Sequence, residues 1–264
     1  MPLYGYGTVL LENQSGVTTL TLNRPDKLNA LNAYLVSDIH DALDDIASDQ
    51  QTKVLIITGS GRSFSAGADV NRQLAALENR IDPSDPMGPD ITEIAPHIRL
   101  IPQPVIAAIN GLAIGAGLST ALASDIRIAS NTAKFSCMFV KRSLVPDAGC
   151  SFTLSKLVGM GTAMEMALTG NIYDSKWALQ KGLVNSVVSS NRLLECANDL
   201  ASNIADNPPI CVSLIKPLMY LQQAHFCEVL DNEREANYIA SSTQDSKEAI
   251  LSFLEKRTPH YRGE

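Results

Sequence analysis

A series of short apolar runs constrains the fold of this chain more than any other feature. The runs at 53–59, 104–110 and 125–130 have the length and composition of buried parallel strands, and 184–188 resembles them. Segments with helical periodicity lie between these runs. Strands that alternate with helices along a chain indicate a parallel sheet with right-handed crossovers. The sequence therefore predicts an α/β fold.

The two ends of the chain depart from this alternation. Residues 9–12 and 17–23 predict a strand pair around the turn NQSG, and 32–48 predicts an amphipathic helix. Beyond about residue 190 only helical patterns remain, so we predict an α/β core over 1–190 and a helical C-terminal region over 191–264. The predicted helices of that region span 191–205, 209–223, 228–241 and 245–255.

The composition is that of an ordinary globular protein. Of the 264 residues, 45% are hydrophobic and 19% are charged, so disorder is not expected outside a proline-rich loop predicted at 79–93. The net charge of −7 offers no basic face for a nucleic acid. No apolar run has the length of a bilayer span, and no signal peptide is recognisable. We therefore expect a cytoplasmic protein without nucleic-acid or membrane partners.

The cysteines and histidines indicate neither disulfides nor a metal site. Five cysteines, an odd number without CxxC spacing, are expected to be reduced thiols that pack as small apolar side chains. The four histidines, at positions 40, 97, 225 and 260, are scattered along the chain. Because zinc ligands usually occur at short, regular spacings, we expect no metal.

Two segments rich in small residues share one design. TGSGRSFSAGAD at 58–69 and NGLAIGAGLSTALASDI at 110–126 each follow a predicted strand and precede a predicted helix. Ligands of open α/β folds collect at this edge of a sheet, where free N–H groups and helix dipoles favour negative charge. Neither segment has the spacing of a phosphate-binding loop. Two interpretations stay open: close helix–strand packing, or an oxyanion hole that takes one backbone N–H from each segment.

Five segments, in order over nearly the whole chain, carry a family resemblance. They are LNRPDKLNAL, GSGRSFSAGAD, PVIAAINGLAIGAG, SLVPDAG and FLEKRTPHYRG, and they resemble the crotonase superfamily, the enoyl-CoA hydratase/isomerase family. The resemblance implies a crotonase-like spiral of ββα turns with a C-terminal helical trimerisation region. It implies a homotrimer or a hexamer of two trimers. It also implies an acyl-CoA thioester substrate and no separate cofactor, because coenzyme A is part of the substrate.

The resemblance also assigns roles to individual residues. It places the oxyanion hole at the N–H groups of Ala68 and Ala116. Without the resemblance, Lys27 and Lys256 would each be interpreted as a solvated surface lysine. The positions that match coenzyme A contacts of the family are Lys27, Ala30, Ala66, Asp69, Val70 and Lys256.

Three further positions bear on the reaction. Hydratases of the family activate water with two glutamates, and the matching positions here are Ser119 and Phe139, neither of which is an acid. Asp147 matches the acid of Δ3,Δ2-enoyl-CoA isomerases and of the ring-epoxide isomerases of phenylacetate catabolism. One carboxylate suffices for a 1,3 proton shift, and apolar neighbours favour a raised pKa. The sequence therefore favours an isomerase with Asp147 as its acid–base residue, although PDAG is also a common turn sequence.

Three other functions stay open. The first is a hydratase with atypical residues. The second is a dehalogenase or hydrolase that uses Asp147 as a nucleophile. Against dehalogenation, Phe139 lacks the N–H of the tryptophan used there, and His97 does not match the spacing of the histidine base. The third is a non-catalytic trimer that binds acyl-CoA.

Overall fold

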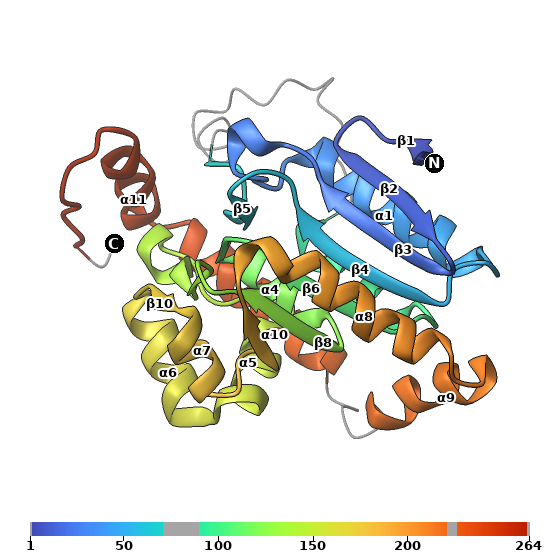
Figure 1. The fold of residues 1–264 in the computed structure, drawn as a ribbon. Helices are drawn as coiled ribbons and strands as arrows, with labels where there is room; N and C mark the ends of the chain where they lie inside the picture. The colour runs from blue at the N-terminus through green and yellow to red at the C-terminus, as the bar shows by residue number, and fades with distance from the viewer. Residues whose placement is uncertain (1, 71–89, 221–225, 263–264) are drawn as a thin grey trace.

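The centre of the fold is a seven-stranded sheet. The computed structural model describes residues 2–70, 90–220 and 226–262 (Figure 1). The first three strands of the sheet are antiparallel neighbours, and the remaining strands run parallel, which confirms the predicted α/β fold. In sheet order the strands are β1 (Pro2–Gly5), β2 (Val9–Gln14), β3 (Val17–Leu22), β4 (Val54–Gly59), β6 (Val105–Ile109), β8 (Ile126–Ser130) and β11 (Ser186–Val188).

A second sheet consists of four short strands. Three of them, β5, β7 and β9, are parallel, and each follows a strand of the larger sheet after a short loop. Helix α4 (Ala116–Ala123) then follows β7. These repeated strand–strand–helix turns lie side by side and confirm the ββα spiral. In order, the strands are β10 (Tyr173–Asp174), β9 (Lys134–Ser136), β7 (Leu112–Ile114) and β5 (Ser63–Ser65).

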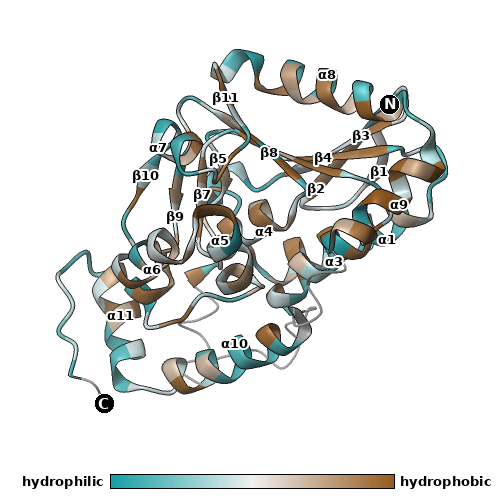
Figure 2. Cartoon of the chain, turned by 90° about the horizontal axis from the view of Figure 1, so that it is seen from below, coloured by the Kyte–Doolittle hydropathy of each residue, from teal (hydrophilic) through white to brown (hydrophobic). Residues whose placement is uncertain are grey.

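Helices cover both faces of the larger sheet. Helices α1 (Ala33–Ser48) and α3 (Ile94–Leu100) lie on one side and α8 (Leu193–Ala205) on the other (Figure 2). The predicted helix at 32–48 begins one residue later because Asn32 is its N-cap, whose side chain accepts a hydrogen bond from the Leu35 N–H at 3.0 Å. The apolar stripe of α1 is buried as its periodicity predicts.

Most of the remaining helices surround the smaller sheet and the carboxyl ends of the strands, whereas the helix at 209–220 lies at the amino ends of β6 and β8, where Lys216 donates to the Gln103 carbonyl at 3.0 Å and pairs with Asp125 at 3.3 Å. All four helices predicted beyond residue 190 are present. The first of them, α8, packs on β4 and β6, so residue 190 marks a change in secondary structure and not a gap in packing. The helices not yet named are α5 (Cys150–Val158), α6 (Met160–Thr169), α7 (Ser175–Gln180), α9 (Pro209–Tyr220), α10 (Phe226–Ser241) and α11 (Gln244–Leu254). Within the described ranges, four 3-10 turns connect the elements: η1 (Pro25–Lys27), η2 (Ile91–Glu93), η3 (Met138–Arg142) and η4 (Ser190–Arg192).

Three predicted segments fall partly or wholly outside the described residues; one is the helix predicted at 209–223, of which 221–223 are not described. The helix expected to begin near Asp69 lies outside them, as does most of the loop predicted at 79–93. The described end of that loop contains the single 3-10 turn η2. The side chain of Asp90 caps η2 by accepting the Thr92 N–H at 2.9 Å. Among the described helices, none combines the length and the apolarity needed to cross a bilayer.

Candidate active site

Glycines let the two small-residue segments approach each other closely. Gly67 has φ +86°, and a Cβ on it would lie 2.6 Å from the carbonyl oxygen of Ile114. A Cβ on Gly117, in the first turn of α4, would lie 2.5 Å from the carbonyl oxygen of Ser65. Both distances are well inside van der Waals contact, so a larger residue would push the segments apart. Close packing, one of the two interpretations of these segments, is therefore confirmed.

The same packing sets the direction of two backbone N–H groups, those of Ala68 and Ala116. Ala68 pairs with Leu31 in an isolated parallel bridge, in which the Leu31 N–H donates to Gly67 at 2.8 Å and the Asp69 N–H donates to Leu31 at 3.0 Å. This register turns the N–H of Ala68 away from Leu31. Ala116 is the first residue of α4, so its N–H has no partner within the helix. Since both alanines line one cavity, the geometry is compatible with the second interpretation, an oxyanion hole.

The cavity that contains both alanines has a volume of about 760 Å³. Its walls come from the loops after β5 and β7, from η3, and from α10 and α11. The volume is within the range of roughly 300–1,000 Å³ that is usual for small-molecule sites. Apolar side chains of its wall include Ile114, Phe139, Leu144 and Phe253. The cavity therefore combines an apolar wall with two backbone donors and a few polar side chains.

Five of the six residues predicted to contact coenzyme A line this cavity. Asp69 also forms an ion pair with Arg24, with 3.2 Å between Oδ2 and Nη1. The sixth residue, Lys256, instead lines an adjacent cavity that also contains Lys141 and Arg257. The structure thus brings together all the predicted contacts except Lys256. The five residues are Lys27, Ala30, Ala66, Asp69 and Val70.

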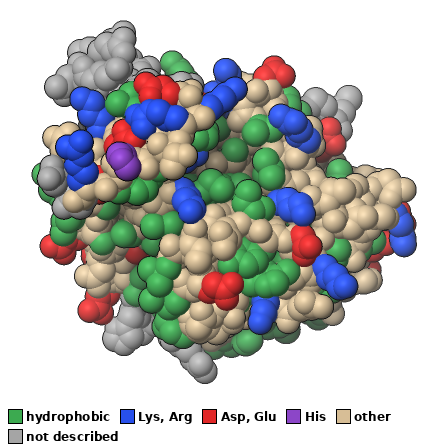
Figure 3. Space-filling view, turned by 90° about the vertical axis from the view of Figure 1, so that its left-hand side faces the viewer, with side chains coloured by type: hydrophobic (Ala, Val, Ile, Leu, Met, Phe, Trp, Pro, Cys, Tyr) green, Lys and Arg blue, Asp and Glu red, His purple; other side chains and the backbone are tan. Residues whose placement is uncertain are grey.

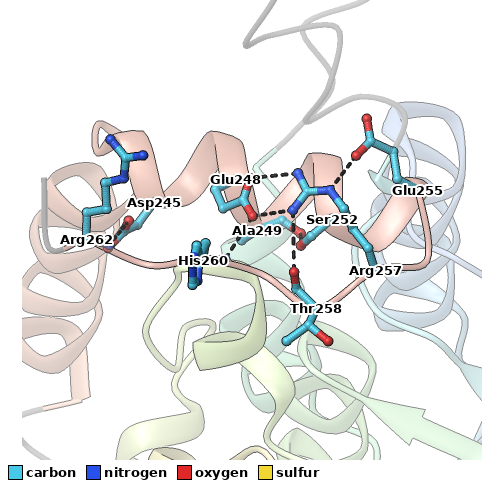
Figure 4. Close-up of polar contacts among 9 residues, drawn as sticks. All are labelled: Asp245, Glu248, Ala249, Ser252, Glu255, Arg257, Thr258, His260 and Arg262. Carbon is cyan, nitrogen blue, oxygen red and sulfur yellow. Dashed lines mark hydrogen bonds and ion pairs between the residues drawn. The ribbon is translucent and has the colours of Figure 1, made fainter.

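The C-terminal segment folds back along α11 and fixes the surroundings of Lys256 (Figure 4). Arg257 bonds Glu248 at 2.8 Å between Nη2 and Oε2, and the His260 N–H donates to Glu248, also at 2.8 Å. These contacts, the Arg257 guanidinium foremost, lower the pKa of Glu248 to about 2. Lys256 lies in the turn that this network holds. On this side of the molecule, Lys and Arg side chains are scattered among hydrophobic ones (Figure 3).

Asp147 lies in the turn before α5 and lines the main cavity. Its Oδ1 atom is buried and has no hydrogen-bond partner among the described residues. Burial, followed by the negative charges of Glu233 and Asp90, raises the pKa of the Asp147 carboxyl to about 7. The backbone of Asp147 forms the turn, because its carbonyl accepts the Cys150 N–H at 2.9 Å. Its side chain has the burial and proton affinity expected of an acid–base group.

The two positions that match hydratase glutamates hold no acid in the structure either. Ser119 is buried in α4, and its hydroxyl donates to the carbonyl oxygen of Asp147 at 3.0 Å. Phe139 is buried in η3 and presents its ring to the cavity wall near Gly115. Ser119 therefore supports the turn of Asp147, and Phe139 contributes to the apolar environment of the cavity.

Helix α10 contributes residues that the sequence patterns did not reveal. Glu233 and Asn237 contact the backbone on either side of Asp147, and Arg234 and Tyr238 line the cavity. A spacing of four residues places Glu233 and Asn237 on one face of the helix, but nothing local shows which segment that face contacts. Packing between segments about 90 residues apart is needed to identify them.

His40 and His97, which are 57 residues apart in the sequence, are in contact. Their Nδ1 atoms are 2.7 Å apart, and the rings stack with centroids 5.0 Å apart. His97 also lies 3.1 Å from Asp44 between Nε2 and Oδ1. His97 is thus engaged between α1 and α3, an arrangement that does not favour a role as the base of a dehalogenase. Among the described residues, no three His, Cys, Asp or Glu side chains gather as metal ligands would.

Comparison with known proteins places this chain among acyl-CoA enzymes. Residues 12–264 match the family model described as enoyl-CoA hydratase/isomerase. The chain is 34% identical to 1,2-epoxyphenylacetyl-CoA isomerase of Escherichia coli, over 97% of this chain and 98% of that protein. It is 36% identical to the short-chain-enoyl-CoA hydratase of Clostridium acetobutylicum, over 94% and 95%. A crystal structure of an enoyl-CoA hydratase from Mycobacterium avium subsp. paratuberculosis matches with a TM-score of 0.86 at 29% identity, over 98% of this chain and 100% of that one. The chain therefore belongs to the enoyl-CoA hydratase/isomerase family.

Proposed function

We propose that the protein is an acyl-CoA isomerase that shifts the double bond of an enoyl-CoA thioester, with Asp147 as its single acid–base group. The observation that carries the proposal is the buried Oδ1 of Asp147, without a partner among the described residues, in the cavity lined by Ala68 and Ala116. The positions of Ser119 and Phe139 provide no carboxylate to activate water, which argues against a hydratase mechanism.

The other carboxylates described in the cavity wall are engaged elsewhere. Asp69 is paired with Arg24 at 3.2 Å. Asp90 caps η2 and lies 3.9 Å from the Nε atom of Arg234. Asp147, by contrast, has a buried carboxyl without a hydrogen-bond partner at Oδ1 among the described residues, and burial raises its pKa to about 7.

The proposed mechanism moves one proton between two carbons. The Asp147 carboxylate removes a proton from C2 of a 3-enoyl-CoA, and the electron pair delocalises over C2, C4 and the thioester oxygen. The N–H groups of Ala68 and Ala116 stabilise the negative oxygen, each by roughly 3–4 kcal/mol in the transition state. The Asp147 carboxyl then returns the proton at C4, which yields the 2-enoyl-CoA and regenerates the carboxylate. A carboxyl with a pKa of about 7 can both accept and return a proton near neutral pH.

The coenzyme A part of the substrate extends, in this proposal, along Lys27, Ala30, Ala66, Asp69 and Val70. Lys256, in the turn after α11, reaches a phosphate of coenzyme A bound to the same subunit or to a neighbouring one. We also propose a homotrimer or a hexamer. Helix α9 supports self-association because Ile210, Leu214 and Leu218, spaced four residues apart and 56–73% exposed, form an apolar face on it. Light scattering of the purified protein tests this part of the proposal.

The substitution Asp147→Asn tests the proposed function. It removes the base while it keeps the size of the side chain, so we expect turnover of 3-enoyl-CoA to fall by roughly 10²–10⁴-fold. The measurement follows absorbance of the conjugated 2-enoyl thioester, with binding of a saturated acyl-CoA measured by calorimetry. The matched control Asp90→Asn changes another carboxylate of the cavity and should keep most of the turnover. Full turnover in Asp147→Asn, or a hydrated product from the wild-type protein, would contradict the proposal.

A further inference from the structure

One helix holds the turn of Asp147 from both sides. The Asn237 side chain accepts the N–H of Val145 at 2.9 Å and donates to the carbonyl of the same residue at 3.1 Å. One turn earlier in α10, Glu233 accepts the N–H of Gly149 at 2.7 Å and the N–H of Ser151 at 2.9 Å. The catalytic aspartate of the proposed function therefore lies between two points at which α10 binds the backbone.

The turn needs this support because two of its residues have an unfavourable backbone conformation and neither can cap α5 with its side chain. Ala148 has φ +51° and Gly149 has φ +71°, so two successive residues adopt the left-handed region, which costs free energy for the alanine. Gly149 is the N-cap of α5 and has no side chain with which to accept the N–H groups of the first turn. Glu233, which belongs to α10, caps α5 instead. Its negative charge is favourable near the positive end of the α5 dipole.

Glu233 is buried, with 6% of its surface exposed, and both of its carboxylate oxygens accept hydrogen bonds. Burial raises the pKa of Glu233, whereas the hydrogen bonds from Ser151 and Gly149 lower it. Burial of a carboxylate costs folding free energy unless hydrogen bonds such as these compensate for the lost water. The neighbouring Arg234 does not neutralise Glu233, because its guanidinium is ion-paired with Glu93 and with Asp231.

The charged and titratable groups that face Asp147 come from three elements. Glu233 approaches from α10, Asp90 from the segment before η2, and the Cys150 thiol from the start of α5. Both carboxylates raise the pKa of Asp147. The Cys150 thiol is buried beside Cys137, which raises its own pKa and keeps it neutral. Glu233 is therefore the main charged neighbour through which the protein can set the proton affinity of Asp147.

We propose that Glu233 is a positioning residue for the proposed isomerisation: its carboxylate fixes the backbone of the turn that carries Asp147, and its negative charge makes Asp147 a stronger base. This inference rests on the proposed function, since it requires that Asp147 acts as the base. Asn237 shares the first task but carries no charge, so it separates positioning of the turn from control of the base.

The test compares Glu233→Gln, Glu233→Asp and Asn237→Ala with Glu235→Gln, a matched control on the exposed side of α10. The measurements are kcat and KM for a 3-enoyl-CoA against pH, and the pKa of Asp147 by NMR of protein carrying ¹³C-labelled aspartate. Asp147 works as a deprotonated base, so kcat/KM of the wild-type enzyme should rise with pH through about 7. Removal of a neighbouring negative charge lowers that pKa, so in Glu233→Gln the rise should move to lower pH.

The variants should differ in kcat and in its pH dependence. In Glu233→Gln, kcat should fall roughly 10–100-fold, as expected for a misplaced catalytic group, with little change in KM. Glu233→Asp keeps the charge but withdraws it from the two N–H groups, so kcat should fall while the pH dependence stays as in the wild type. Asn237→Ala should behave in the same way, and Glu235→Gln should match the wild type. If Glu233→Gln proves unstable, the Glu233→Asp and Asn237→Ala pair still measures the positioning role.

Two outcomes separate this inference from the proposed function. If Asp147→Asn abolishes turnover but Glu233→Gln leaves both kcat and the pH dependence unchanged, the inference is wrong and the proposed function stands. If Asp147→Asn keeps its turnover, the proposed function is wrong, and the inference about the base falls with it. A lower melting temperature of Glu233→Gln with an unchanged pKa of Asp147 by NMR would assign Glu233 a structural role only and would overturn the inference.

Discussion

The two halves of the candidate active site are built in different ways. The segments around Ala68 and Ala116 carry their signature in the local sequence: glycines that allow close approach, a strand before each segment, and a helix start at Ala116. The turn of Asp147 depends instead on distant residues, because Glu233 and Asn237 lie more than 80 residues further along the chain. Local sequence is therefore enough to identify the first half, whereas the second is defined by tertiary packing.

Among substitutions that leave the Asp147 carboxylate in place, the largest effect is expected in the locally encoded half. Gly67→Ala places a Cβ 2.6 Å from the Ile114 carbonyl oxygen and forces a side chain into φ +86°. The N–H of Ala68 must then move, so kcat should fall roughly 10²–10³-fold, as for loss of one oxyanion donor. Steady-state kinetics and thermal unfolding provide the measurement.

Gly161→Ala is the matched control for that substitution. Gly161 lies in α6 with nothing within 4 Å of a Cβ, so alanine should be neutral or stabilise by up to ~1 kcal/mol. Equal kinetics for Gly67→Ala and Gly161→Ala would show that the close approach of the two segments does not position the Ala68 N–H.

A second prediction concerns the free energy of unfolding in the Asp147 half. Its carboxyl has a pKa of about 7 in the folded protein against 3.8 ordinarily, so the folded state favours the protonated form. The stabilisation is fully present below pH 3.8 and is lost as pH rises through about 7. Asp147→Asn resembles the protonated form, so at pH 8 it should unfold with a free energy roughly 1–2 kcal/mol above the wild type.

Denaturant unfolding at pH 8 and at pH 3.5 checks this prediction. The difference between Asp147→Asn and the wild type should shrink at the lower pH, where both side chains are uncharged. A variant that is less stable than the wild type at pH 8 would mean that the Asp147 carboxylate has a stabilising partner in the folded protein.

The smallest effect is expected where the two halves meet. The Ser119 hydroxyl, in the helix that begins at Ala116, donates to the Asp147 carbonyl at 3.0 Å. Ser119→Ala removes this hydrogen bond, which costs about 1 kcal/mol of stability. Because Glu233 and Asn237 still hold the turn, kcat should change by no more than about tenfold. A larger loss of kcat, measured at saturating substrate, would make Ser119 the main support of Asp147.

The sequence was sufficient for much of the fold. Apolar runs predicted the parallel strands β4, β6 and β8, and the apolar periodicity of α1 predicted that helix to within a residue. The family resemblance predicted the ββα spiral, whose three-residue strands β5, β7 and β9 are too short to show a periodicity of their own. Fold elements that extend over several residues are thus predictable from pattern.

The candidate site was predictable only in part. The resemblance singled out Asp147 and the two alanines, and the structure places all three at one cavity. It could not place Lys256, which lines the neighbouring cavity, because the position of α11 depends on packing far from that residue. The contact of His40 with His97 was missed for the same reason, since α1 and α3 meet only in the folded chain.

The most direct test of the central claim follows the proton itself. A 3-enoyl-CoA carrying two deuterons at C2 is converted by the wild-type enzyme in ordinary water, and the product is examined by NMR and mass spectrometry. Transfer by the single carboxyl of Asp147 predicts a 2-enoyl-CoA that carries deuterium at C4. A 3-hydroxyacyl-CoA product would contradict transfer of the proton by one buried carboxyl. So would a 2-enoyl-CoA in which the hydrogen added at C4 comes only from the solvent.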